Sequence, residues 1–186
     1  MPVHDFTLVV AGLDPESEEL ADALFQAGCD DATFGSVDGV GYGDFHREAP
    51  TAAEAIDSAI RAVESVVGLG VLRVEPDDLV TLSEIAERLG RTRESVRLLV
   101  AGERGPGDFP PPASHLRSRN RLWRWSEVAP WAARADPEAA AEAQVVAAIN
   151  AALELRNRLG GLSAKNRSVV SALTRVTGPR NRPRQA

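Results

Sequence analysis

The sequence predicts an α+β protein whose N-terminal part alternates strands with helices and whose C-terminal part is mainly helical. Short β-prone runs and amphipathic helical runs follow one another over residues 1–76. Two short helical patterns separated by a glycine follow from residue 81. With 186 residues, 44% of them hydrophobic and 26% charged, the chain has the size and composition of one or two globular domains.

Four strands and two helices are predicted in residues 1–76. Asp14 is expected to cap the first helix with Pro15 at its first position, and Thr51 with Glu54 forms a capping box before the second. Asp38-Gly39 is a strong signal for a two-residue hairpin turn. The strands are expected at 6–11, 31–37, 40–45 and 71–74.

The predicted order β-α-β-β-α-β resembles the ferredoxin-like arrangement, in which two helices cover one face of a four-stranded antiparallel sheet. Residues 1–76 are therefore interpreted as a domain of this type. The fold pattern is shared by domains that sense small molecules, dock proteins or dimerise, so it assigns no single function.

The negative charge of the chain, −6 overall, is confined to its first part. Residues 1–80 hold 3 Arg against 17 Asp and Glu, whereas residues 81–135 hold 10 Arg against 6. Residues 136–186 hold 8 Lys and Arg against 4 Asp and Glu. A basic segment favours a nucleic-acid partner. The alternative, that each part has only drifted to its own solubility charge, stays open.

A helix-turn-helix is predicted from residue 81. Thr81 and Glu84 form a capping box, Gly90 ends the first helix, and Thr92 caps the second. The apolar residues at helical spacing are Leu82, Ile85, Ala86 and Leu89, then Val96, Leu99 and Val100. Because such helix pairs also occur as plain structural hairpins, this pattern alone does not decide the function.

The segments LSEIAERLGRTRESVRLLV and FPPPASHLRSRNRLWRWSEVAPWA resemble the winged helix-turn-helix of MerR-type regulators and excisionase-like DNA-binding proteins. The resemblance implies a DNA-binding domain at residues 77–135. It also implies that RLWRW (121–125) is the returning strand of a wing and that SEVAPWA (126–132) is a helix capped by Ser126. The tryptophans are interpreted as core residues.

By this resemblance the second helix would lie in the major groove, where residues near its N-terminus reach base edges. Arginine is the commonest reader of guanine. The wing arginines would contact phosphates or the minor groove; their alternative role is a solvated hairpin face. The expected DNA-binding residues are Arg91 (phosphate), Thr92, Arg93, Ser95 and Arg97 (bases), and Arg117, Arg119, Arg121 and Arg124 (wing).

Residues 136–176 are predicted to be helical. One helix starts at Asp136-Pro137, runs to about Leu159 and is stopped by Gly160-Gly161; a shorter one follows at 163–176. The alanine-rich stripe of the long helix either docks on the winged domain or pairs with a second copy in a homodimer. Residues 177–186 are expected to form a basic, disordered tail.

Catalysis, metals and membranes find no support in the sequence. The three histidines and the single Cys29 are scattered without ligand spacing, and no nucleophile and base are paired. We therefore expect no enzyme activity, no metal and no cofactor. The longest apolar runs are too short to span a bilayer, and the single cysteine fits a reducing compartment, so a cytoplasmic location is expected.

Two functions are carried forward from the sequence. The first is a sequence-specific transcriptional regulator that binds double-stranded DNA, with an N-terminal domain that senses, docks or dimerises. In that case the acidic domain would lower non-specific affinity by repelling DNA. The alternative is an antitoxin-like autoregulator whose acidic domain binds a partner protein.

Overall fold

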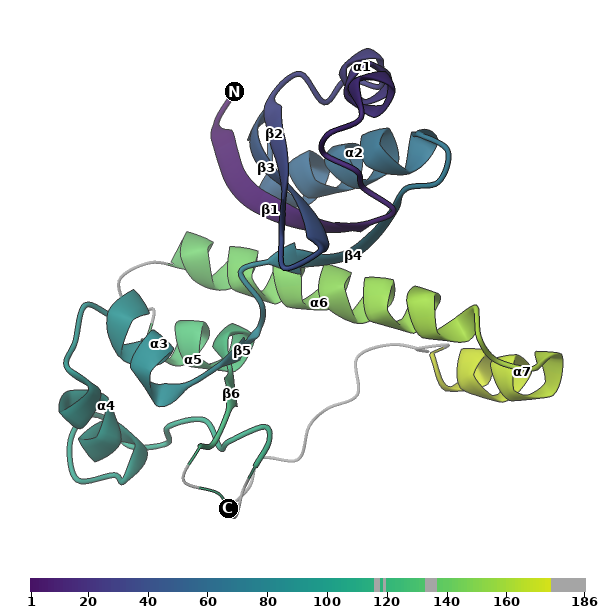
Figure 1. The fold of residues 1–186 in the computed structure, drawn as a ribbon. Helices are drawn as coiled ribbons and strands as arrows, with labels where there is room; N and C mark the ends of the chain where they lie inside the picture. Colours follow the sequence, from purple (N-terminus) through teal and green to yellow (C-terminus); the bar gives the residue numbers. More distant parts are fainter. Residues whose placement is uncertain (116–117, 119, 133–136, 175–186) are drawn as a thin grey trace.

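The computed structural model describes residues 1–115, 118, 120–132 and 137–174. Within them it is an α+β structure with seven helices, a four-stranded antiparallel sheet and a two-stranded sheet (Figure 1). The strands are β1 (Val3–Ala11), β2 (Ala32–Val37), β3 (Val40–Glu48), β4 (Gly70–Glu75), β5 (Leu79–Val80) and β6 (Trp123–Arg124). The helices are α1 (Glu18–Gln26), α2 (Ala52–Ser65), α3 (Leu82–Arg88), α4 (Arg93–Val100), α5 (Trp125–Ala132), α6 (Pro137–Leu159) and α7 (Ala164–Leu173).

The four-stranded sheet has the order β2-β3-β1-β4, and each neighbouring pair is antiparallel. Side chains alternate along a strand, so one face of β1 carries Phe6, Leu8 and Val10 into a core with α1 and α2. The opposite face of the sheet carries polar side chains such as Asp44 and His46. The first six elements therefore follow one another in the order expected from the sequence.

The hairpin between β2 and β3 forms at the predicted turn. Asp38 and Gly39 both have left-handed backbones, with φ of 52° and 78°, and Val37 pairs with Val40. These angles match the right-handed twist of the flanking strands. Tyr42 lies across Gly35, where a Cβ would come within 2.7 Å of the tyrosine hydroxyl oxygen.

The cap predicted for the first helix was wrong. Ser17 caps α1, with its hydroxyl accepting a hydrogen bond from the Leu20 N–H at 3.3 Å. Asp14 instead accepts from the Glu16 N–H at 3.1 Å. The Asp14 carboxylate is therefore used in the turn before the helix, and the helix starts about one turn later than expected.

A buried arginine joins β3 to the loop after α1. Arg47, 8% exposed, donates from Nε and Nη2 to the two carboxylate oxygens of Asp31, both at 2.7 Å. Its Nη2 also donates to the Gly28 carbonyl at 2.6 Å, and its guanidinium lies over the Phe45 ring. A buried charge is tolerated when it is paired and hydrogen-bonded in this way.

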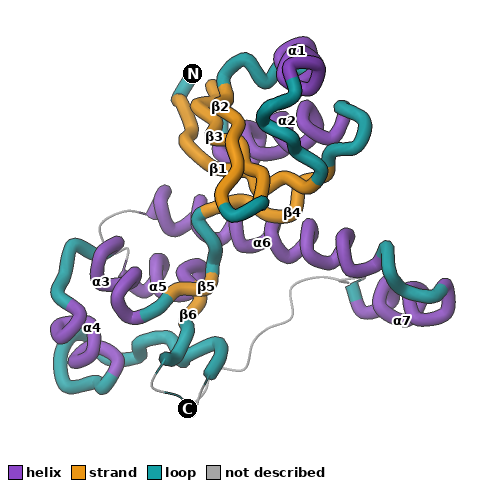
Figure 2. Tube along the Cα trace, viewed as in Figure 1, coloured by secondary structure: helices purple, strands orange, loops and turns teal. Residues whose placement is uncertain are grey.

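Helix α6 crosses the molecule between the four-stranded sheet and the α3–α5 unit (Figures 1 and 2). The Asn150 side chain accepts from the Val74 N–H at 2.7 Å and donates to the Val74 carbonyl at 2.8 Å. Leu153 is buried in the core of the sheet, and Val146 and Ile149 pack against that core. The predicted bounds of this helix are confirmed, and it packs on both β4 and α5.

We expect Asn150→Ala to lower the free energy of unfolding by about 2–4 kcal/mol, because one N–H and one C=O of a partly buried strand edge lose their partners. Urea denaturation of the full chain would measure this loss. Asn157→Ala is the control, since Asn157 makes only long contacts of 3.3 and 3.5 Å to the same strand. Equal losses for the two variants would contradict the role assigned to Asn150.

Candidate nucleic-acid interface

The pair α3–α4 is built by local signals in the sequence. Thr81 and Glu84 form a reciprocal capping box: the Glu84 N–H donates to the Thr81 hydroxyl at 3.3 Å, and the Thr81 N–H donates to the Glu84 carboxylate at 2.6 Å. Gly90 adopts a left-handed backbone with φ of 60°. The Arg91 N–H then closes the turn on the Ala86 carbonyl at 2.8 Å.

Helix α4 presents an apolar face inward and a charged face outward. Its N-cap is Thr92, whose hydroxyl accepts from the Ser95 N–H at 3.2 Å. Val96 and Leu99 are buried, and Arg93 is exposed. Of the expected base-reading residues, Thr92 therefore uses its side chain in the cap of the helix, and Ser95 only its backbone N–H.

The returning wing strand predicted at 121–125 was wrong in extent. Only Trp123–Arg124 forms a strand, and it pairs with β5, where Val80 lies opposite Trp123. A single antiparallel bridge joins Ser114 to Leu122. The reason is the apolar burial of Trp123, which is 3% exposed beside Val80 and Ile85. Trp123 therefore belongs to the core, as expected.

The predicted cap of the next helix was also wrong. Helix α5 begins at Trp125, and the Ser126 N–H donates to the Asp78 carboxylate at 2.7 Å. Asp78, only 8% exposed, also accepts from the Arg124 guanidinium at 3.1 Å. A carboxylate at a helix N-terminus is favourable, and here it comes from a segment 48 residues earlier in the chain.

A hollow of about 910 Å³ lies between α4, the start of α3 and the segment before β6. It brings together three expected DNA-binding residues, Arg93, Arg97 and Arg121. The lining also includes Thr81, Leu82, Ser83, Glu94, Val100, Asn120 and Trp123. The hollow thus combines guanidinium groups from two separate segments with hydroxyl groups, which suits a phosphate-bearing ligand.

The arginines around this hollow differ in their partners. Arg97 donates from Nε to both carboxylate oxygens of Glu94 at 3.0 Å. The hydrogen bond with Arg97 holds the pKa of Glu94 below its ordinary value and raises the pKa of Arg97. Within the described part of the chain, Arg91, Arg93 and Arg121 are in no ion pair. These three side chains can therefore bind an anion without first breaking an ion pair to another described residue.

The remaining expected residues do not join the group. Arg124 is paired with buried Asp78, which fits a structural role. Arg117 and Arg119 lie outside the described residues. Sequence reasoning missed Glu94, although its spacing of three residues from Arg97 is a known helix-pair signal. It also missed Asp78, whose partners are distant in the chain and leave no local signal.

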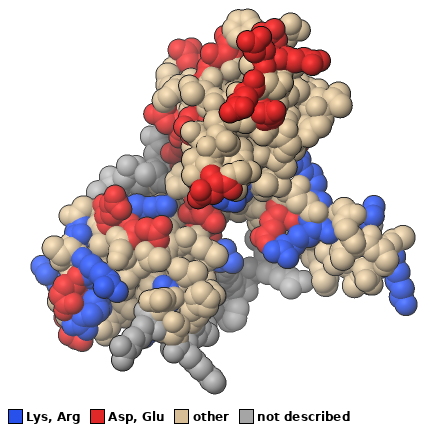
Figure 3. Space-filling view, viewed as in Figure 1, with Lys and Arg blue, Asp and Glu red and all other residues tan. Residues whose placement is uncertain are grey.

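The charges divide between the two lobes of the molecule. In Figure 3 the lobe with α1 and the four-stranded sheet carries mainly red side chains, whereas the lobe with α3 and α4 carries blue and red side chains together.

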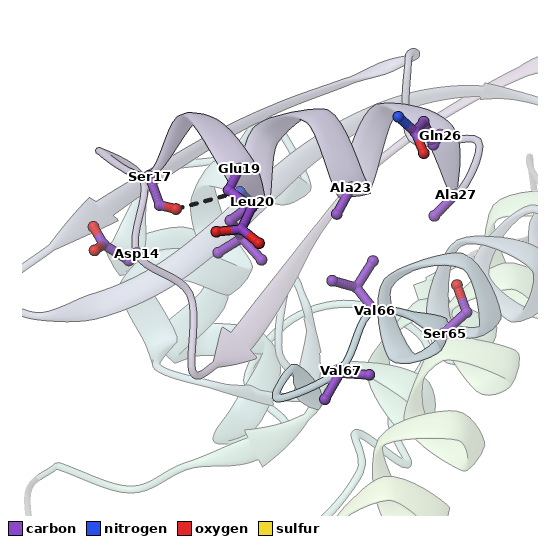
Figure 4. A pocket seen from close by; sticks show the side chains of 10 residues that line it. All are labelled: Asp14, Ser17, Glu19, Leu20, Ala23, Gln26, Ala27, Ser65, Val66 and Val67. Carbon is purple, nitrogen blue, oxygen red and sulfur yellow. Dashed lines mark hydrogen bonds between the residues drawn. The ribbon is translucent and has the colours of Figure 1, made fainter.

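A second hollow, of about 620 Å³, lies in the acidic lobe between α1 and the turn after α2 (Figure 4). Leu20, Ala23 and Val66 line its apolar part, and Ser17 is already used to cap α1.

No known protein family, curated protein or solved structure matches the chain. Among the described residues there is no cluster of three or more His, Cys, Asp or Glu side chains that could hold a metal ion. None of the helices in that same part is long and apolar enough to cross a membrane.

We expect the capping box of α3 to make stability depend on pH. The hydrogen bond from the Thr81 N–H holds the pKa of Glu84 below its ordinary value of 4.5. A lowered pKa in the folded state gives stability that is present above about pH 4.5 and is lost as the pH falls through the folded value. Urea denaturation between about pH 7 and pH 3 should therefore show a smaller acid loss in Glu84→Gln than in the wild type. Glu87→Gln is the charge control from the same helix, and identical curves for the wild type and Glu84→Gln would contradict this account.

Proposed function

We propose that the chain is a sequence-specific regulator that binds double-stranded DNA through α3 and α4. In this proposal residues 77–135 form a winged helix-turn-helix and the N-terminal unit is a ferredoxin-like sandwich. Helix α4 enters the major groove, and the segment before β6 contacts the backbone. The observation that carries the proposal is the hollow that joins Arg93 and Arg97 of α4 to Arg121.

The spacing of the arginines on α4 supports this assignment of the helix. Arg93 and Arg97 are four residues apart on α4 and both exposed, so they lie one helical turn apart on the same outward face. An arginine forms paired hydrogen bonds to guanine O6 and N7, and such a pair discriminates by about 1–3 kcal/mol. Arg91, exposed in the turn, is assigned to a phosphate.

The acidic unit has a physical role in the same proposal. Residues 1–80 carry a net charge of −14, and their repulsion from DNA lowers the affinity for random sequences. The same repulsion lowers the affinity for every DNA sequence, while base contacts still favour the specific site, so random DNA is left mostly unbound. A second candidate function, an autoregulator whose acidic unit binds a partner protein, is favoured by the edge strand β2, with which no other described strand pairs on its outer side.

Selection of a pool of random-sequence duplexes on the full chain should enrich a common site. We expect Arg93→Ala/Arg97→Ala to lower affinity for that site by about 2–6 kcal/mol, because two guanine-reading side chains are removed. Fluorescence anisotropy would measure the affinity. Arg61→Ala/Arg73→Ala, which removes two arginines that are not on α4, should lower it much less, through the added repulsion alone.

Two results would overturn the proposal. The first is a selection that enriches no sequence at all. The second is an enriched site that the Arg93/Arg97 double variant and the Arg61/Arg73 double variant bind equally well, because α4 would then play no part in recognition.

We expect Glu94→Gln to strengthen binding to random-sequence duplexes at low salt. The substitution removes a negative charge beside the DNA and releases Arg97 from its ion pair. If Arg97 then neutralises a phosphate, the slope of log affinity against log salt becomes steeper by about 0.9. Anisotropy across a salt series measures this slope, with Glu87→Gln as the control; an unchanged slope would place Arg97 away from the phosphates.

A further inference from the structure

The two edges of the four-stranded sheet differ in what covers them. The β4 edge is covered by α6, whose Asn150 amide accepts a hydrogen bond from the N–H of Val74 and donates one to its C=O. At the opposite edge is β2, and no described strand pairs with its outer side. An uncovered edge is a ready template for another extended chain.

The outward backbone groups of β2 can be identified from its register. In a two-residue hairpin the residues flanking the turn, here Val37 and Val40, exchange backbone hydrogen bonds. At the other end the His46 N–H donates to the Asp31 carbonyl at 3.0 Å. Because hydrogen-bonded and non-hydrogen-bonded residues alternate along an antiparallel strand, the N–H and C=O of Phe34 and Ser36 point away from β3. Within the described part of the chain neither residue has a backbone partner on that side.

A partly apolar hollow lies beside this edge. It measures about 350 Å³ and is formed between α1 and β2, with Leu20, Leu24, Phe25 and Phe34 among its lining residues. Phe25 is 67% exposed, so its ring in the lining of the hollow is accessible to a bound segment. A strand added to β2 would direct every second side chain toward this hollow.

The rim of the hollow is acidic. Asp14 and Asp30 line it, and Glu18 and Asp22 lie on the exposed side of α1. In Figure 3 the surface around α1 carries many red side chains. This charge disfavours a second copy of the chain, because the second copy would bring the same acidic side chains, from a segment with 3 Arg against 17 Asp and Glu, to this surface. It favours an occupant that carries Lys or Arg.

We propose that β2 and the adjoining hollow bind an extended segment of a partner protein by β-strand addition. The segment has apolar side chains at alternate positions and Lys or Arg beside them. Main-chain hydrogen bonds to Phe34 and Ser36 supply affinity, and the hollow with its acidic rim supplies specificity. This surface belongs to the N-terminal unit with the four-stranded sheet, whereas α4 belongs to the helical part of the chain. The proposal therefore does not depend on DNA binding.

A displayed library of random peptides about twelve residues long, selected on the full chain, tests the proposal. Selected peptides should alternate apolar residues with Lys or Arg. Ser36→Pro removes an outward N–H at an edge position where proline is tolerated, and should weaken binding at least about tenfold. Ser36→Ala, which keeps the N–H, should bind as the wild type does. Hydrogen exchange should show slower exchange at Phe34 and Ser36 when peptide is bound.

Phe25→Ser gives a second test that leaves the strand unchanged, because this side chain is largely exposed. It should weaken peptide binding while the unfolding curve stays as in the wild type. The proposal is overturned if no peptide is enriched, if enriched peptides are acidic, or if they bind Ser36→Pro and Phe25→Ser as tightly as the wild type. It is also overturned if sedimentation shows a dimer that Ser36→Pro dissociates, because a second copy would then be the occupant.

Discussion

The need to satisfy the outer edge of β4 decides how the rest of the molecule is arranged. One side-chain amide, that of Asn150, takes the place of a neighbouring strand for Val74. Because a strand edge that loses such partners is penalised when partly buried, α6 is held along β4. Arg156 adds to this contact by pairing with Glu64 and donating to the Val71 carbonyl.

Because α6 is held on the sheet and packs on α5, the helices α3, α4 and α5 are positioned as well. Helix α5 packs on α6, and Asp78, in the segment that leaves the sheet, caps α5 through the Ser126 N–H. The acidic unit and the α3–α4 pair are thus linked by a helix and by a buried carboxylate. Removal of residues 1–76 would uncover Val146, Ile149 and Leu153, so charge substitutions test the acidic unit more cleanly than truncation does.

The proposed DNA surface is moderately rather than strongly basic. Arg97 is already paired with Glu94, whereas Arg93 and Arg121 are free of ion pairs within the described residues. Few arginines on such a surface can contact a phosphate without first breaking an ion pair, which limits non-specific affinity. The large negative charge of the N-terminal unit acts in the same direction. Both features fit a protein whose affinity comes mainly from a particular sequence and from a protein partner.

The sequence by itself determined the elements that depend on neighbouring residues. The capping box of α3, the Asp38-Gly39 turn and the bounds of α6 follow from local hydrogen bonding, backbone preference and helix-stopping glycines, and all were predicted. Tertiary structure decided the contacts between distant residues: Trp123 opposite Val80, and Asn150 on Val74. Local patterns cannot predict these contacts, because the partners are far apart in the sequence and meet only when the chain has folded.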